Sequence, residues 1–211
     1  FEKSLAENAG MGWVGKHTLL IHKTSGSFFV LGELFTSLEL PFDQATTKHC
    51  GSCSACIDIC PTQAIVEPYL LDARKCIAYL TIEFQGIIPE ELRRGIGNRV
   101  FGCDDCQLIC PWNSFAKTTP IDDFNPRHGL DDIQLIDLWQ WDENTFMANT
   151  EGSPLRRTGY QSFMRNVAIG LGNAPFSDEI LQQLQASRPE LNDIVQVHID
   201  WAIQEQLMKR H

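Results

Sequence analysis

The sequence predicts an α+β fold, with short strands near the N-terminus and helices toward the C-terminus. Apolar runs at 19–21 and 27–35 flank the turn-forming stretch 23–26, which predicts a strand hairpin. From residue 132 onward, apolar side chains recur at helical spacing. All 8 cysteines lie between these two parts. We therefore expect a cysteine-rich module between two flanks of different secondary structure.

Turn-forming and apolar stretches divide the chain into four predicted segments. Each segment has its own composition, and the third is a connector rich in Pro, Asp and Asn. The boundaries fall at 1–47, 48–112, 113–131 and 132–211.

Helix start and stop signals recur along the chain. Residues 1–9 predict a helix with Gly10 as its C-cap, and 71–84 has helical spacing. The stretch 89–97 begins with proline, carries acids before arginines, and ends at glycine. The break at 172–175 separates amphipathic pieces that resemble a HEAT-like unit. The C-terminal pieces are expected near 132–140, 142–148, 154–171, 177–187 and 190–208.

Length and composition indicate an ordinary globular protein of one large or two small domains. The chain has 211 residues, 43% hydrophobic and 21% charged, and a net charge of −10. No apolar run approaches the roughly 20 residues that span a bilayer, and no signal-peptide pattern is present. We expect a cytoplasmic monomer without membrane contact, in which structural disulfides are disfavoured. The start at Phe1, without methionine and within helix-like sequence, predicts a fragment of a longer protein.

The cysteines follow the bacterial ferredoxin pattern. CGSCSACIDICP at 50–61 is the run C-x2-C-x2-C-x3-C-P, whose fourth cysteine binds the other cluster of a pair. CDDCQLICPW at 103–112 is an incomplete second copy, and Cys76 can stand in for its missing cysteine. We expect two 4Fe-4S clusters and hence electron transfer. One takes Cys50, Cys53, Cys56 and Cys110, and the other takes Cys60, Cys76, Cys103 and Cys106.

Zinc and disulfides explain the pattern less well. Zinc sites use C-x2-C pairs but do not require two trailing C-x3-C-P turns. Disulfides disagree with the expected compartment.

Five stretches together resemble epoxyqueuosine reductase, in the order of that family and over nearly the whole chain. They are FEKSLAENAGMGWVGKHTLLI, CGSCSACIDICPTQAI, LDARKCIAYLTIE, GNRVFGCDDCQLICPWN and SPLRRTGYQSFMRNVAIGLGN. The resemblance implies a cobalamin-dependent reductase that converts epoxyqueuosine to queuosine at the wobble position of tRNA. Residues 1–47 would then be the end of an α/β cobalamin-binding domain. An unidentified electron donor would reduce the clusters.

The resemblance also implies cobalamin contacts in a glycine-rich turn and beside the clusters. From the residues alone, a strand-entry turn with a surface lysine explains the same stretch. Neither His17 nor His22 is assigned as a cobalt ligand. The implied contacts are Trp13, Gly15, Lys16, His17, Thr18, Cys103 and Asp104.

No catalytic residue is assigned. The family's proposed general acid, an aspartate, lies a few residues before the segment that begins here at Phe1. We therefore expect this chain by itself to be inactive.

Arginines at a predicted helix start suggest an RNA contact. Ser153 and Pro154 are expected to open the longest C-terminal helix, whose free N–H groups and dipole suit phosphate. Surface ion pairs with acids such as Glu151 or Asp142 are the alternative. The candidate tRNA-binding residues are Arg156, Arg157, Tyr160, Arg165, Arg93 and Arg94.

Two other functions compete with the reductase. A ferredoxin-like electron carrier needs no helical region after its clusters. A cobalamin-dependent reductive dehalogenase needs no phosphate-binding face. Affinity for tRNA separates all three.

Overall fold

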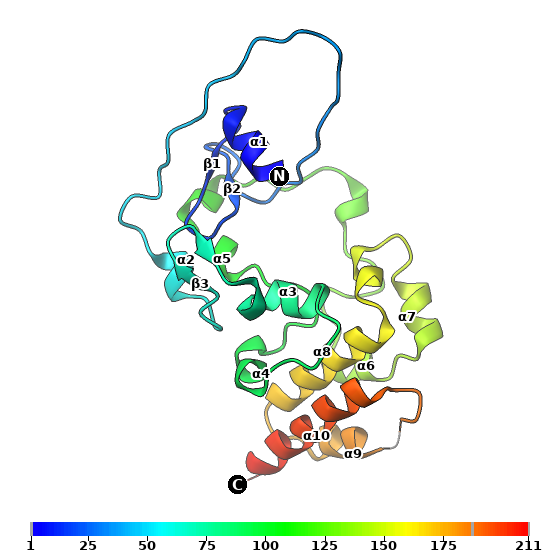
Figure 1. Ribbon diagram of the computed structural model, residues 1–211. Helices are drawn as coiled ribbons and strands as arrows, with labels where there is room; N and C mark the ends of the chain where they lie inside the picture. Colours follow the sequence, from blue (N-terminus) through cyan, green and yellow to red (C-terminus); the bar gives the residue numbers. More distant parts are fainter. Residues whose placement is uncertain (1, 187, 211) are drawn as a thin grey trace. The chain divides into compact units, whose positions relative to one another are not determined.

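The computed structural model describes residues 2–186 and 188–210, and these fall into two compact units (Figure 1). The first unit is formed by Phe1–Ala73 with Asp104–Pro120, and the second by Arg74–Cys103 with Ile121–His211. The chain therefore crosses between the units twice inside its cysteine-rich part. The mixed, helix-rich class agrees with the α+β prediction. The four segment boundaries stay predictions.

A short helix and a hairpin open the first unit. Helix α1 (Glu2–Asn8) ends just before Gly10, where the sequence predicts its C-cap. Strands β1 (Trp13–Val14) and β2 (Leu20–Ile21) pair antiparallel, with Trp13 opposite Ile21. The Val14 N–H donates to Glu7 Oε1 at 2.9 Å, so the hairpin is tied to α1.

The strand predicted over 27–35 is wrong. Residues 28–49 have no regular secondary structure, and the hairpin instead joins β1 to β2. Val30, Leu34 and Phe35 are among the most exposed apolar side chains described. A strand is stable only when its main-chain groups pair and one face is covered, and β-propensity alone provides neither.

The helices of the two cysteine runs are alike and lie within the first unit. Helix α2 (Ala55–Asp58) and helix α5 (Asp105–Leu108) each make about one turn and pack together. A second hairpin, β3 (Ile65–Glu67) with β4 (Leu70–Leu71), follows α2. The 3-10 helix η2 (Pro111–Phe115) follows α5.

The second unit is helical and is built around α8 (Tyr160–Asn173). This helix is buried along most of its length and lies beside α10 (Asp193–Met208) (Figure 1). A Cβ at Gly172 would lie 2.7 Å from Trp201 Cζ3, so the missing side chain allows the two helices to approach closely. The other elements are η1 (Ala73–Lys75), α3 (Ile77–Ile82), α4 (Glu90–Ile96), η3 (Asp122–Phe124), α6 (Leu135–Trp139), α7 (Glu143–Asn149), η4 (Pro154–Thr158) and α9 (Asp178–Gln185).

Most predicted helices of this unit are present, but two are divided. The stretch with helical spacing over 71–84 begins at the end of β4 and forms η1 and then α3. The stretch predicted as a single helix over 154–171 forms η4 and then α8, separated by Gly159 at φ +74°. The longest C-terminal helix is α10, not the one that Ser153 was expected to open. The HEAT-like character stays a prediction. Within the described part of the chain, no helix combines the length and apolar character needed to cross a bilayer.

Candidate iron–sulfur centre

The first cysteine run forms a tight turn that a lysine holds from outside. The Cys53 N–H donates to the Cys50 carbonyl at 3.1 Å, and α2 then carries Cys56. Lys16 Nζ donates to the Gly51 carbonyl at 2.8 Å and to the Cys53 carbonyl at 2.7 Å. The turn between β1 and β2 therefore helps to set the shape of the cysteine loop.

Cys110 is held by a hydrogen-bonded group around Asn113. The Asn113 N–H donates to the Cys110 carbonyl at 2.9 Å. Asn113 Nδ2 donates to the Gln107 carbonyl at 2.7 Å, and its Oδ1 accepts from the Ser27 N–H at 2.6 Å. Residues far apart in the sequence thus fix the turn that carries the fourth thiol.

Four cysteines predicted to share one cluster line one cavity of about 540 Å³. They are the free thiols Cys50, Cys53, Cys56 and Cys110, and all lie in the first unit. Burial raises the pKa of Cys56 and that of Cys110, and negative charge on neighbouring thiols raises both further. Bound iron would reverse this preference, because its ligands are thiolates. The donor set and the space both suit an iron–sulfur cluster.

The thiols do not form a site for a single ion as they stand. Among residues 2–186 and 188–210, no three His, Cys, Asp or Glu side chains are grouped as one ion would require. An iron–sulfur cluster binds its cysteines around several iron atoms and thus needs no such convergence on a point.

The other four cysteines are divided between the two units. Cys60 and Cys106 belong to the first unit, and Cys76 and Cys103 to the second. Cys60 Sγ accepts from the Ala64 N–H at 3.2 Å, and Cys76 stands at the N-cap of α3. Their grouping around a second cluster stays a prediction.

The turn predicted to bind cobalamin also borders the thiol cavity. Lys16 and His17 line this cavity with the four cysteines. Trp13 and His17 are buried, with exposed fractions of 1% and 2%. Trp13 Nε1 and His17 Nε2 are buried polar atoms without a hydrogen-bond partner in the described structure. Burial lowers the pKa of His17 to about 4, so its ring is neutral at pH 7.

Two aromatic residues beside the cavity were missed by sequence reasoning. His49 and Trp112 line the cavity, and both rings pack against Trp13, at centroid distances of 4.9 and 4.8 Å. The sequence indicates them only by their position next to predicted cluster ligands: His49 directly precedes Cys50, and Trp112 follows the Cys110-Pro111 pair.

Three residues predicted to bind RNA are buried in the second unit. Arg165 is 1% exposed, and its guanidinium donates to the carbonyls of Leu80, Phe84 and Gly86 at 2.7–2.8 Å. Burial lowers its pKa to about 10, and it still carries its charge at pH 7. Arg93 is 4% exposed and donates to the Ile88 carbonyl at 2.9 Å. A direct phosphate contact is therefore not expected from either arginine.

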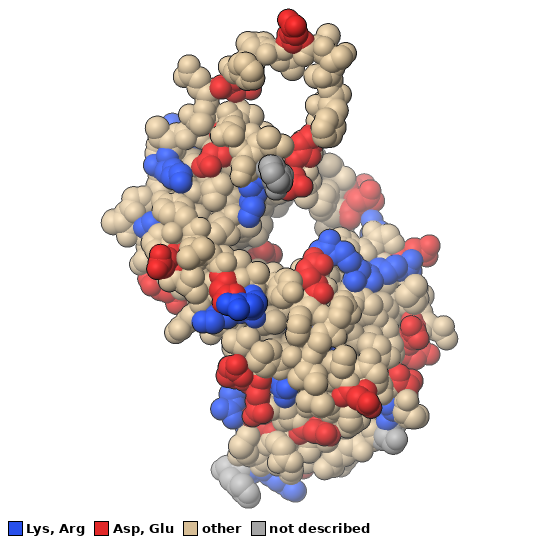
Figure 2. Space-filling view, viewed as in Figure 1, with Lys and Arg blue, Asp and Glu red and all other residues tan. Residues whose placement is uncertain are grey.

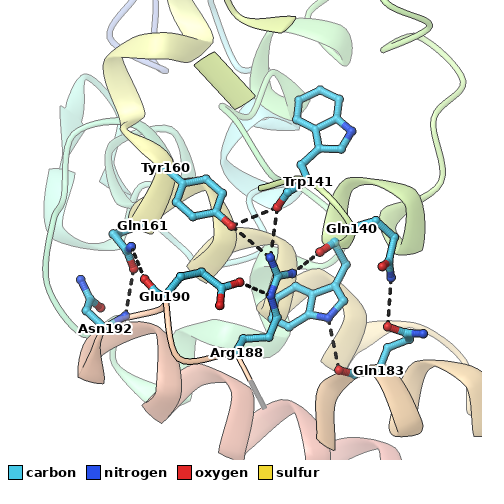
Figure 3. Close-up of polar contacts among 9 residues, drawn as sticks. Gln140, Trp141, Tyr160, Gln161, Gln183, Arg188, Glu190 and Asn192 are labelled. Atoms are coloured by element: carbon cyan, nitrogen blue, oxygen red, sulfur yellow. Dashed lines mark hydrogen bonds and ion pairs between the residues drawn. The ribbon is translucent and has the colours of Figure 1, made fainter. Parts of the chain in front are cut away.

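Tyr160 is the third of these buried residues, and Figure 3 shows where its hydroxyl points. It donates to the Trp141 carbonyl at 3.0 Å and accepts from Arg188, whose guanidinium also reaches Glu190 at 2.7 Å. This group ties the connection between α9 and α10 to the turn at 139–141. The expected RNA contact of Tyr160 is thus replaced by a structural role.

The remaining candidate arginines are at the surface but have protein partners. Arg94 pairs with Glu205 at 2.8 Å, Arg157 pairs with Glu83, and Arg156 donates to the Met147 carbonyl. Arg156 and Arg157 lie in the last turn of η4 and not in the first turn of a helix. They therefore do not lie among the free N–H groups of a helix start that were expected to bind phosphate. On the face in Figure 2, basic side chains of the second unit lie next to acidic ones.

Sequence comparison identifies the cysteine-rich part independently. Residues 49–113 match the family described as a 4Fe-4S double cluster binding domain. The chain is also 57% identical to the epoxyqueuosine reductase of Pseudomonas aeruginosa over 203 residues, and 52% identical to that of Escherichia coli over 210. By sequence, the chain is similar to part of the epoxyqueuosine reductases. These alignments cover 96% and 100% of the chain but only 56% and 55% of the relatives' lengths.

Solved structures show the same relationship. A crystal structure of epoxyqueuosine reductase with an epoxyqueuosine-modified tRNA stem loop matches with a TM-score of 0.89 at 29% identity. It covers 98% of this chain and 55% of that one. Epoxyqueuosine reductase from Streptococcus thermophilus matches with a TM-score of 0.87, also at 29% identity. The chain therefore spans about half the length of the reductases it matches.

Proposed function

We propose that this chain is the electron-delivery and RNA-docking part of an enzyme that reduces epoxyqueuosine to queuosine at the wobble position of tRNA. The observation that carries the proposal is the cavity lined by Cys50, Cys53, Cys56 and Cys110. It occurs in a chain 57% identical to an epoxyqueuosine reductase. The substrate is inferred from the names of the relatives. The thiols would bind the iron–sulfur clusters that deliver electrons to it.

The reaction requires electrons and protons in equal number. Converting an epoxide to an alkene consumes two electrons and two protons, and the oxygen leaves as water. Iron–sulfur clusters transfer electrons one at a time, so two clusters in series suit a two-electron reduction. The second cluster would be held by Cys60, Cys76, Cys103 and Cys106.

Cobalamin is the cofactor that the resemblance implies for the substrate step. When bound, it would supply the low-valent cobalt that passes electrons to the epoxide. Trp13, Gly15 and His17 are buried, and His17 lines the cluster cavity, so none of the three suits direct contact with a large cofactor. Lys16 and Thr18 on the same turn are partly exposed and would be the contacts there. Cys103 and Asp104 complete the proposed set.

RNA docking would fall to the surface arginines. Arg94, Arg156 and Arg157 are the candidates left once the buried residues are set aside. Their present carbonyl and carboxylate partners would have to exchange for phosphate. Arg157 has an exposed side chain, at 65%, and so has Arg94, at 69%.

The test uses the intact enzyme, reconstituted without oxygen with iron and sulfide. About eight irons per protein and conversion of epoxyqueuosine-containing tRNA are expected, falling to about four irons and no conversion in Cys110→Ser. Ser54→Ala is the matched control, because Ser54 lies inside the cysteine loop and its hydroxyl donates to the exposed Asp58 carboxylate. Full iron without any conversion of tRNA would favour the electron-carrier alternative.

A further inference from the structure

The His17 ring faces the thiol cavity, and its position there is closely restricted. It lines the cavity with the four cysteines and is 2% exposed. A Cβ on Gly15 would lie 3.0 Å from His17 Cε1 and 2.6 Å from Ile21 Cδ1. The absence of a side chain at position 15 thus makes room for the imidazole.

The hydrogen bond on one side of this ring decides which nitrogen carries the proton. The Leu19 N–H donates to His17 Nδ1 at 3.1 Å, so Nδ1 holds a lone pair. The neutral ring then has its proton on Nε2. Because burial lowers the pKa of His17 to about 4, the ring stays in this neutral form at pH 7.

The resulting N–H has nothing to bond to in the described protein. His17 Nε2 is buried and has no hydrogen-bond partner. Leaving such a donor unpaired costs about 1–3 kcal/mol, so buried donors in folded proteins are nearly always satisfied. The missing acceptor therefore belongs to something that occupies the cavity.

We propose that His17 Nε2–H donates a hydrogen bond to a sulfur of the cluster held by Cys50, Cys53, Cys56 and Cys110. The inference rests on the cluster of the proposed function. Reduction adds negative charge to the cluster, and an N–H donor stabilises the reduced form more than the oxidised form. Hydrogen bonds to cluster sulfurs are one of the determinants of reduction potential. His17 would thus be a tuning residue of the electron path and not a metal ligand.

The first test is a redox titration of the intact enzyme with both clusters and without cobalamin, followed by electron paramagnetic resonance. His17→Phe removes the donor. We expect its first cluster to be about tenfold harder to reduce, or about 59 mV lower for a one-electron couple. His17→Gln, which keeps an N–H donor, should restore much of the potential. An unchanged potential in a fully loaded His17→Phe protein would overturn the proposal.

His22→Phe is the matched control, because this histidine follows the same hairpin but its ring contacts Thr24 and does not line the cavity. It should leave both potentials unchanged, and the second cluster should keep its potential in all variants. A shift of both clusters in His17→Phe would show a general disturbance and would also count against the proposal.

A second measurement uses the wild-type enzyme and therefore does not depend on whether a variant folds. In the wild-type enzyme with 15N-labelled histidine, pulsed magnetic resonance of the reduced first cluster should detect one imidazole nitrogen and one exchangeable proton. Absence of both signals would mean that water or another group accepts from His17, and the proposal fails. If these signals are present but the wild-type enzyme does not convert epoxyqueuosine in tRNA, the result would count against the proposed function alone.

Discussion

Arg165 shows that one buried charge can organise a large part of the second unit. Its guanidinium on α8 donates to the carbonyls of Leu80, Phe84 and Gly86 at 2.7–2.8 Å. The neighbouring Asn166 accepts from the same guanidinium at 3.0 Å and donates to the carbonyls of Thr81 and Val100. The two side chains thus satisfy the main chain where α3 ends and no helical bonds are available.

Arg165→Met should therefore be strongly destabilising. It leaves three carbonyls without their donor, and at about 1–3 kcal/mol for each unsatisfied buried group the loss is at least about 3 kcal/mol. We expect the free energy of unfolding, measured with denaturant, to fall by about that amount. Arg210→Met is the control, because Arg210 is exposed and lies 3.8 Å from Asp178. Its effect should stay below about 1 kcal/mol, and equal losses in the two variants would refute this account.

At the scale of elements, the packing of α8 on α10 depends on a residue without a side chain. A Cβ at Gly172 would lie 2.7 Å from Trp201 Cζ3 and 2.9 Å from Ala202 Cα. A Cβ at Gly170, on the same helix, would come closest to the flexible end of Leu135, at 3.0 Å, and would meet Asn98 Cα only at an ordinary contact distance of 3.7 Å. The sequence does not show which of the two glycines has room for a side chain, because this depends on how α8 packs against its neighbours.

Gly172→Ala should destabilise the protein by about 1–3 kcal/mol, since overpacking forces two helices apart. Gly170→Ala should be near neutral, because helix propensity favours Ala by up to about 1 kcal/mol and the Leu135 end can move. Thermal unfolding of both variants checks this. The interpretation fails if the substitution at Gly172 is the milder of the two.

A second contact between elements predicts how stability depends on pH. His198 on α10 is fully buried, and its Nδ1 lies 2.7 Å from the Ile194 carbonyl while its Nε2 accepts from the Ile88 N–H at 3.1 Å. Burial lowers its pKa from 6.5 to about 4. The unfolded chain therefore binds the proton more readily, and the stabilisation is complete above pH 6.5 and is lost as pH falls toward 4.

His198→Gln should remove this dependence. We expect the stability difference between wild type and variant to shrink by up to about 1.4 kcal/mol per pH unit between 6.5 and 4. Denaturant titrations at several pH values measure it. His17 is present in both proteins, so its own titration cancels. A constant difference over this range would show that His198 does not titrate as inferred.

At the scale of the whole molecule, the residues proposed for electron delivery and those proposed for RNA docking belong to different units. The first cluster cavity is formed within the first unit, and the surface arginines proposed for RNA belong to the second. The chain carries a net charge of −10. A general attraction to RNA is thus not expected, and any affinity must come from local groups.

Charge reversal at Arg156 and Arg157 in the intact enzyme should weaken tRNA binding and flatten its salt dependence. Each lost phosphate contact lowers the slope of log affinity against log salt by about 0.7–0.9. Arg210→Glu changes the charge as much as either single reversal does, away from η4, and should leave the slope unchanged. Binding measured at several salt concentrations decides this, and identical slopes for all proteins would remove these arginines from the interface.

Much of the fold was predictable because its signals are local. The helix over 89–97 begins at Pro89 and ends at Gly97, and α4 follows these signals closely. The structure of residues 27–35 was not predictable in this way, because a strand is stable only when it pairs with another segment, which can lie elsewhere in the chain. Arg165 was misread for a related reason, since an arginine looks the same in the sequence whether it faces water or a set of carbonyls.

By itself, the sequence predicted that Cys50, Cys53, Cys56 and Cys110 lie together, as they do in one cavity, because the ferredoxin spacing limits which cysteines can meet. Only the tertiary structure decided what surrounds them. It placed Lys16 on the cysteine loop and His17 in the wall of the cavity, although both lie more than thirty residues before Cys50. Such contacts depend on how distant segments pack, and no local pattern encodes them.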